Sequence, residues 1–208
     1  MAGPEAALLN GLYDQRGELP GLSERPVSIP PMTDDQRLPS ADEQARLWDL
    51  IEAAWAPLEE EVNRARRALA SRVPDEDGDA ALITVIDEAL DDFLRNLTER
   101  SRELPAAELT ALDRVLERRL HDIDRADVHA VTDGSDDGFL YARGFIVALG
   151  PDYYAAVAGD PSMAVLDAEC ETMCYFFAHL HHERFGHFPQ TGSGITRESC
   201  SNPAGWPE

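Results

Sequence analysis

Lysine is missing from this sequence. All 18 cationic residues are arginine, 40 residues are acidic, and the formal net charge at pH 7 is −22. The absence of lysine excludes Schiff-base catalysis and the phosphate-binding lysine of a P-loop. A surface this negative repels nucleic-acid phosphates and anionic bilayers. The arginines that cluster, at 64–67 and 118–119, are interleaved with acidic residues. We therefore expect neither nucleic acid nor a membrane as a partner.

Long apolar runs and paired cysteines are also lacking. No apolar run approaches the roughly 20 residues of a membrane span, and the N-terminal residues lack the basic region and apolar core of a secretory signal. Cys170 and Cys174 are four residues apart on an expected helix, so their Cβ atoms lie about 5–6 Å apart, whereas a disulfide needs about 3.8 Å. Cys200 is the third and last cysteine. We interpret the first two as small buried apolar residues and predict a reducing, cytoplasmic location.

Strand-like alternation extends over no more than four residues, so the predicted fold class is all-α. Residues 1–39 are rich in proline and form an expected flexible leader, in which Met32 is an alternative translation start to Met1. Residues 40–189 form a predicted single compact bundle of five or six helices. Residues 190–208 are predicted to be a flexible tail.

The first predicted helix begins at Ser40, because Ser40 and Glu43 have the spacing of a capping box. Its apolar residues follow spacings of three and four, which indicates a buried seam. They are Trp48, Ile51, Trp55, Leu58, Val62, Ala65 and Leu69. Pro57 removes an amide and clashes with the preceding turn, so it predicts a kink or two helices end to end.

Three more helices follow from apolar periodicity and from helix-breaking residues. After a predicted turn at 73–79, one helix continues to about Arg102. Another begins near Pro105, whose missing amide costs nothing in a first turn. A third extends from about Ser162 to Phe185 and ends at Gly186.

The stretch "TDGSDDGFLYARGF" (132–145) invites a metal-binding or catalytic interpretation. Four of its residues match the first positions of an EF-hand calcium loop: Asp133, Ser135, Asp137 and Gly138. The bidentate glutamate of position 12 is absent, because Gly144 stands there. Asp136 and Asp137 are sequence neighbours and point about 100° apart on a helix, so they cannot share a proton. We predict instead that Ser135 caps a helix whose first turn carries two acids.

That helix, 136–149, has two apolar arcs and a strip of small residues at Gly144 and Ala148. A helix that is apolar on two sides is buried between neighbours, so we place it at the centre of the bundle. Arg143 then needs a carboxylate partner, which we expect from another helix. The alternative is that Arg143 binds a ligand in a cleft together with Asp136 and Tyr141.

The run "SDDGFLYARGFIVALGPDYYAAVAGDP" (135–161) resembles the hallmark of a bacterial domain-of-unknown-function family, number 4240. The matching residues are Ser135, Asp136, Asp137, Phe139, Arg143 and Phe145, the last standing where the family prefers tryptophan. "LWDLIEAA" and "ELPAAELTALDRVLERRL" resemble two further helices of that family, so the resemblance covers about residues 40–190. Upstream of the hallmark this chain has only the shorter "ADVHAVTDG". The resemblance implies a helical fold and no particular activity.

The histidine cluster "HLHHERFGH" (179–187) does not fit a zinc-protease motif. His182 and Glu183 are followed by His187, one residue too far for HExxH, and Gly186 ends the helix. His179, His182 and Glu183 fall on one side of the helix and form a candidate metal triad. The simpler interpretation is a surface run of histidines.

No catalytic residue and no cofactor are predicted. We predict a cytoplasmic protein that acts without catalysis, through contacts with an unidentified protein partner, in a regulatory or accessory role. The exposed edge of the Trp48–Trp55 seam could also mediate homodimerisation. The alternatives are a small-molecule enzyme or sensor built around Arg143, and a metal-binding protein using the histidine cluster.

Overall fold

The computed structural model describes residues 37–74, 76–132 and 135–206, all of which belong to one compact unit, 35–208. The predicted leader lies outside the described residues except for its last three positions, and so does the choice between Met1 and Met32. In the described residues no helix is both long enough and apolar enough to cross a membrane.

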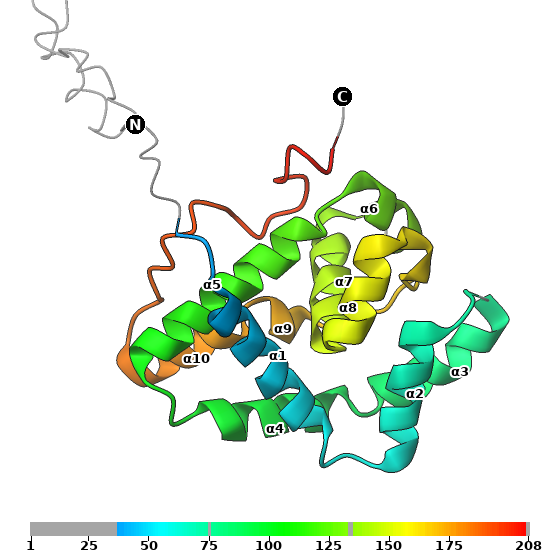
Figure 1. Cartoon of the computed structure of the whole chain (residues 1–208), viewed down its shortest axis with the longest axis horizontal. Helices are drawn as coiled ribbons and strands as arrows, with labels where there is room; N and C mark the ends of the chain where they lie inside the picture. Colours follow the sequence, from blue (N-terminus) through cyan, green and yellow to red (C-terminus); the bar gives the residue numbers. More distant parts are fainter. Residues whose placement is uncertain (1–36, 75, 133–134, 207–208) are drawn as a thin grey trace, which may run out of the picture. The chain divides into compact units, whose positions relative to one another are not determined.

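The described residues form ten α-helices and one short 3-10 helix, and they contain no strand, which confirms the all-α class (Figure 1). The elements are α1 (Ala41–Trp55), α2 (Glu60–Ser71), α3 (Glu76–Asp87), α4 (Leu90–Ser101), α5 (Ala106–Asp122), α6 (Ala126–Thr132), α7 (Asp136–Ala148), α8 (Pro151–Gly159), η1 (Pro161–Met163), α9 (Glu171–Cys174) and α10 (Phe176–Phe185). The prediction of five or six helices was too low. Besides the break at Pro57, two predicted helices are each broken, and α6 and α8 were not predicted.

The first break was predicted correctly. The Ser40 amide donates to Glu43 Oε2 at 2.8 Å and the Glu43 amide to Ser40 Oγ at 3.1 Å, so the capping box starts α1 as expected. The helix ends at Trp55, two residues before Pro57, and α2 begins at Glu60. The proline therefore separates two helices, because it cannot continue the hydrogen-bond ladder.

Two other breaks were not predicted, because no local residue signals them. The helix expected to reach Arg102 ends at Asp87, and α4 restarts at Leu90, where Phe93 stacks on Trp55 at a ring-centroid distance of 4.4 Å. The helix expected over 162–185 is mostly irregular before Glu171. There the Cys170 amide donates to the Tyr141 carbonyl of α7 at 3.0 Å, instead of to its own helix.

Helix α7 is buried along nearly its whole length, as predicted. Ten of its residues from Gly138 onward are buried, and it contacts α5, α6, α8 and α9. A Cβ atom at Gly144 would lie 2.5 Å from the Cys170 carbonyl oxygen and 2.6 Å from Cys174 Sγ. The small residue therefore allows α9 to approach the α7 backbone closely, which confirms the predicted role of the small-residue strip at this position.

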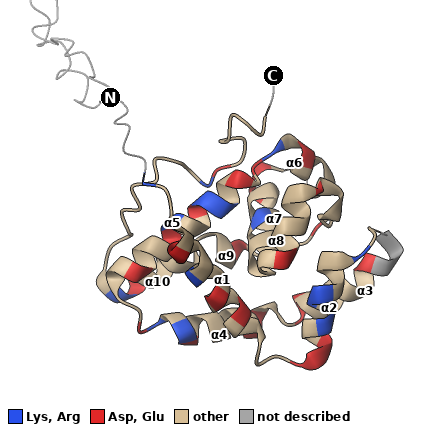
Figure 2. Ribbon diagram, in the orientation of Figure 1, with Lys and Arg blue, Asp and Glu red and all other residues tan. Residues whose placement is uncertain are grey.

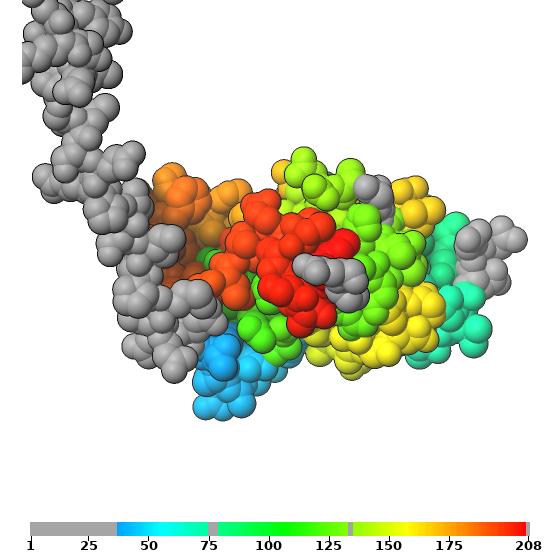
Figure 3. Space-filling model, turned by 90° about the horizontal axis from the view of Figure 1, so that it is seen from above, coloured from blue at the N-terminus to red at the C-terminus, as the bar shows by residue number. Residues whose placement is uncertain are grey.

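The segment after residue 189 differs from the flexible tail that we expected. In Figure 3 its orange-to-red residues lie against the surface of the helical unit. Arg114 of α5 donates to the Thr191 carbonyl at 2.6 Å. Arg197 is buried and forms an ion pair with Asp113 of α5 at 2.6 Å. Glycine- and serine-rich composition predicted flexibility, but specific polar contacts with α5 and α7 hold residues 190–206.

Candidate functional site

Arg143, the arginine of the hallmark, lies inside the fold and is 0% exposed. Its Nη1 donates to the Leu120 carbonyl at 3.0 Å, and its Nη2 donates to the Arg197 carbonyl at 2.9 Å and to Ser199 Oγ at 3.1 Å. The guanidinium also lies 4.8 Å from the centre of the Phe139 ring. Two of the three oxygen partners come from the tail, so the arginine joins α5, α7 and the tail.

The predicted carboxylate partner of Arg143 was wrong. Within the described ranges Arg143 forms no ion pair; burial lowers its pKa, and the charge of the buried Asp124 acts in the opposite direction from beyond ion-pair distance. The Leu120 carbonyl belongs to the last turn of α5, where carbonyls have no helical partner and the helix dipole is negative. The carbonyl at the end of α5 therefore stabilises part of the positive charge that we expected a carboxylate to neutralise.

Asp136 and Tyr141 do not join Arg143 around a common space. The Asp136 side chain is exposed, and its backbone carbonyl accepts a hydrogen bond from Ser199 Oγ at 2.6 Å. Tyr141 is half-buried, and its backbone carbonyl accepts from the Cys170 amide at 3.0 Å. Neither of the two cavities described below is lined by any of these three residues.

The calcium and acid-pair hypotheses concern the start of α7. Ser135 caps the helix as predicted, because its Oγ accepts from the Gly138 amide at 3.0 Å. The side chains of Asp136 and Asp137 are exposed. Asp133, the first position of the possible calcium loop, lies outside the described residues.

Asp124, which the sequence analysis did not single out, is fully buried between α5 and α6. Its carboxylate accepts from the amides of Cys200, Ser201 and Asn202 at 3.0, 2.7 and 2.9 Å, and from the Trp206 indole at 2.9 Å. Consecutive amides that converge on one carboxylate form an anion-binding nest. Asp124 is therefore the polar centre on which the tail folds. In the sequence it is one of three aspartates, with Asp122 and Asp127, and only its position just after a long helix could have distinguished it.

The candidate metal triad does not converge on one point. His179, His182 and Glu183 are all exposed, and the two histidines stack on aromatic rings, His179 on Tyr175 and His182 on Phe188. In the part of the chain that the structure describes, no group of three or more His, Cys, Asp or Glu side chains is arranged to hold a metal ion.

His181 differs from its neighbours because it is buried. Its Nδ1 lies 2.8 Å from the His187 carbonyl. Gly186, at φ 79°, ends α10 as predicted, and this contact fixes the chain just beyond it.

The two buried cysteines have the structural role that we expected. Burial raises the pKa of Cys170 to about 11 and that of Cys174 to about 12, and the Cys174 thiol donates to the Leu140 carbonyl at 3.3 Å. At neutral pH both are thiols and not nucleophilic thiolates. Cys200 is exposed.

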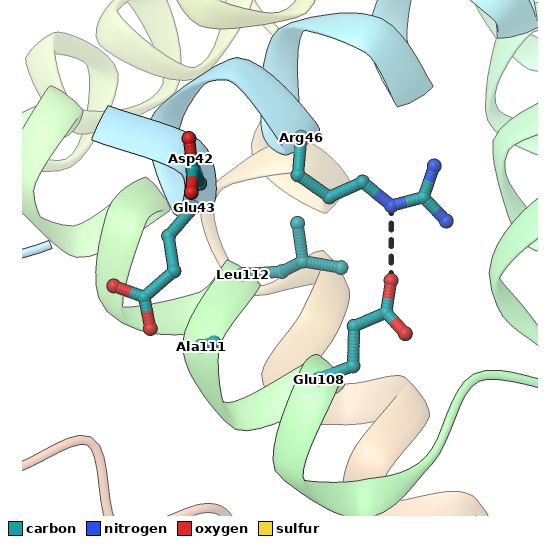
Figure 4. A pocket seen from close by; sticks show the side chains of 6 residues that line it. All are labelled: Asp42, Glu43, Arg46, Glu108, Ala111 and Leu112. Carbon is teal, nitrogen blue, oxygen red and sulfur yellow. Dashed lines mark hydrogen bonds and ion pairs between the residues drawn. The ribbon is translucent and has the colours of Figure 1, made fainter. Parts of the chain in front are cut away.

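A small cavity of about 220 Å³ lies between the start of α1 and α5 (Figure 4). Three of its four charged side chains already bind other side chains or the backbone. Arg46 forms an ion pair with Glu108 at 2.9 Å across the opening, and Glu43 is occupied by the Ser40 cap and by Arg114. Little hydrogen-bonding capacity is left for a ligand, so we assign this cavity a structural role.

A larger cavity of about 710 Å³ lies between α3, α6 and the segment 161–166, and we call it the α3–α6 groove. Its lining is mainly aliphatic and includes Ile83, Val131, Val165 and Leu166. The Leu166 side chain is 64% exposed at the edge of the groove, although a leucine of this kind is usually covered. Val73, which precedes the lining residue Pro74, is also largely exposed. Of the two cavities this one is the larger, and most of its lining residues are aliphatic.

The segments that form the α3–α6 groove supply no arginine or lysine, and Arg72, which reaches it from just outside these segments, is paired with Asp79. The sequence contains no arginine or lysine within 73–94, 126–142 or 144–183, the segments that supply the groove and its borders. In Figure 2 the ribbons of α3 and α8 accordingly carry red and no blue, whereas α2 and α5 carry both colours. Asp160 and Asp167 lie exposed on either side of the lining segment.

One acidic side chain, Asp79, lines the groove. It is paired with Arg72 through the Arg72 Nε, and Arg72 also donates to the carbonyls of Leu69 and Met163. Among the described residues, Arg72 Nη2 and the nearby Tyr153 hydroxyl have no hydrogen-bond partner, and both atoms are buried. Both atoms are sealed from solvent, so an occupant of the groove would meet the Asp79 carboxylate and not these two donors.

Residues 79–182, half of the chain, match the model of the family described as Protein of unknown function (DUF4240). The match contains the hallmark of α7 and most of the groove lining, and it is shorter than the predicted range of 40–190. No curated protein and no solved structure matches the chain.

Proposed function

This chain belongs to the DUF4240 family, and we propose that it acts through protein–protein contacts, as a cytoplasmic regulatory or accessory protein, with the α3–α6 groove as its docking face. One observation carries this proposal: an apolar groove of about 710 Å³ with an exposed leucine at its edge. Apolar surface that stays open in a folded domain marks sites of interaction.

The two rival surfaces find less support. An enzyme or sensor built on Arg143 would need that guanidinium to reach a ligand, but its hydrogen bonds go to α5 and to the tail. A homodimer through the tryptophan seam would need free indole rings. Trp55 is 0% exposed, and Trp48 packs on Tyr154 at a centroid distance of 5.4 Å.

Position-specific photo-crosslinking in the cell that makes this protein tests the proposal. A photoreactive amino acid replaces Leu166 in one variant and Leu38 in the matched control, because the two leucines are 64% and 65% exposed and only Leu166 lines the groove. We expect a discrete adduct with another protein from position 166 and much less of it from position 38. After identification by mass spectrometry, the partner should bind the purified protein more weakly when Leu166→Ser is introduced. Equal labelling from both positions, or adducts with a second copy alone, would contradict the proposal.

A further inference from the structure

We infer that the α3–α6 groove binds a cationic amphipathic helix, with the helix's apolar stripe in the groove and its basic residues at the acidic border. This inference rests on the proposed function and names the chemistry of the partner. It follows from the shape and lining of the groove together with the charge of the segments around it.

The lining fits the apolar stripe of a helix. Ile83 comes from α3, Val131 from α6, and Val165 and Leu166 from the irregular segment, so aliphatic side chains meet from three directions. A helix that lies in such a groove inserts residues spaced three and four apart. In the small cavity beside α1, Arg46 and Glu108 pair across the opening, whereas in the described part of the chain no two lining residues of the groove form an ion pair.

Charge decides which helix the groove accepts. Three separate segments with no arginine or lysine meet here, in a chain whose net charge is −22. The acidic side chain in the lining, Asp79, is paired with Arg72, so the negative charge that a partner would meet comes from the acidic residues around the groove. Asp160 and Asp167 add exposed carboxylates at the border. An acidic helix would be repelled by this field, whereas a basic one gains both association rate and specificity.

Direct binding of designed peptides tests the inference. Fluorescence anisotropy would be measured with three labelled peptides of equal length: a leucine–lysine helix with an apolar stripe, the same helix with glutamate in place of lysine, and a scrambled leucine–lysine peptide without a stripe. We expect the striped cationic helix to bind the full chain at least about tenfold more tightly than the other two.

Two pairs of variants assign the binding to the groove. Leu166→Ser should weaken the striped cationic peptide about tenfold, the loss expected for one buried leucine, and Leu38→Ser should leave its affinity unchanged. Asp167→Asn should weaken binding and reduce its salt dependence, while Asp49→Asn should not. Asparagine suits position 167 because its φ of 56° lies in the left-handed region. All four residues are exposed, and circular dichroism would check that each variant is folded.

Each outcome decides between the two proposals. Equal binding of the scrambled peptide would mean unspecific charge attraction, and equal binding of the glutamate peptide would remove the role of charge; either result overturns the inference. A partner crosslinked at position 166, combined with no binding of the striped cationic peptide, also overturns the inference but leaves the proposed function intact. Failure of the crosslinking test would overturn the proposed function itself.

Discussion

The Asp124→Asn substitution should release the tail from the helical unit. Asp124 is 0% exposed, and its two carboxylate oxygens divide the donors between them. Oδ1 accepts from the Cys200 amide and the Trp206 indole, and Oδ2 from the amides of Ser201 and Asn202 and from the Ser201 hydroxyl. An asparagine must place its NH₂ group on one of these two sides, so at least two N–H donors lose their acceptor.

The expected cost follows from the number of orphaned donors. A buried donor without a partner costs about 1–3 kcal/mol, so two of them cost about 2–6 kcal/mol. The tail can escape part of this cost by detaching and giving its amides back to water. We therefore expect a loss of about 2–4 kcal/mol in the free energy of unfolding, together with local opening of residues 196–206.

Two measurements check this prediction. Urea unfolding gives the change in stability, and hydrogen–deuterium exchange reports directly on the amides of Cys200, Ser201 and Asn202. The matched control is Asp122→Asn, whose carboxylate is partly exposed and pairs with Arg118 at 2.8 Å, so it should change stability by less than about 1 kcal/mol. If Asp124→Asn lost no more stability than this control and its three amides stayed protected, the role of Asp124 as the centre of the tail would be refuted.

Three further predictions concern the packing, the thiols and the first helix. Gly144→Ala should lower the free energy of unfolding in urea by about 1–3 kcal/mol, because its Cβ would lie 2.5 Å from the Cys170 carbonyl oxygen. The control Gly159→Ala, whose Cβ would meet nothing within 4 Å, should be nearly neutral. Similar losses at both positions would contradict the close approach of α9. Ellman's reagent at pH 8 should titrate one thiol quickly in the native protein and all three after denaturation, since Cys200 is exposed and the other two cysteines are buried; fast reaction of all three would show that α9 does not cover its cysteines. The hydrogen bond from the Ser40 amide lowers the pKa of Glu43 below its usual 4.5 in the folded protein, so the ionised Glu43 contributes its full stabilisation above pH 4.5 and loses it as the pH falls through the lower folded pKa. Glu43→Gln should therefore lower the free energy of unfolding at pH 7 and change it little at pH 2. An equal loss at both pH values would contradict this explanation.

The helix starts could be predicted because their signals are local. Ser40 and Glu43 satisfy each other's amides within a single turn, and Ser135 caps Gly138 three residues later. Both contacts depend on residues that are neighbours in the sequence, so no knowledge of the fold is needed. The same is true of Pro57, which stops a helix whatever surrounds it.

Contacts between distant segments could not be predicted in this way. Cys170 lies in a stretch with helical periodicity, but its amide bonds to the Tyr141 carbonyl and the helix is interrupted. Arg143 was expected to find a carboxylate, and its partners are carbonyls at the end of α5 and in the tail. Sequence reasoning identifies that a buried cation needs oxygen atoms, but it does not say which backbone will supply them.

The groove is the clearest example of this limit. Ile83, Val131 and Leu166 belong to separate segments, and none of them stands out in its own stretch. The sequence feature that could have indicated it is the uneven placement of arginine, which the sequence analysis did not consider: arginine is missing from 73–94, 126–142 and 144–183. The absence of arginine from these segments indicates a shared surface only when the fold is known to bring them together around one cavity.

The family match and the folding unit do not coincide, and the difference has a physical consequence. The match covers 79–182, which includes Arg143 and Asp124, but the groups that satisfy these two residues lie mostly between 197 and 206. The apolar core likewise needs Trp55 and Leu69, which precede the match and are 0% exposed. A buried guanidinium and a buried carboxylate left without their partners would each cost several kcal/mol. The matched segment is therefore completed on both sides by residues outside it, and the smallest stable unit of this chain should extend from the Ser40 cap to Trp206.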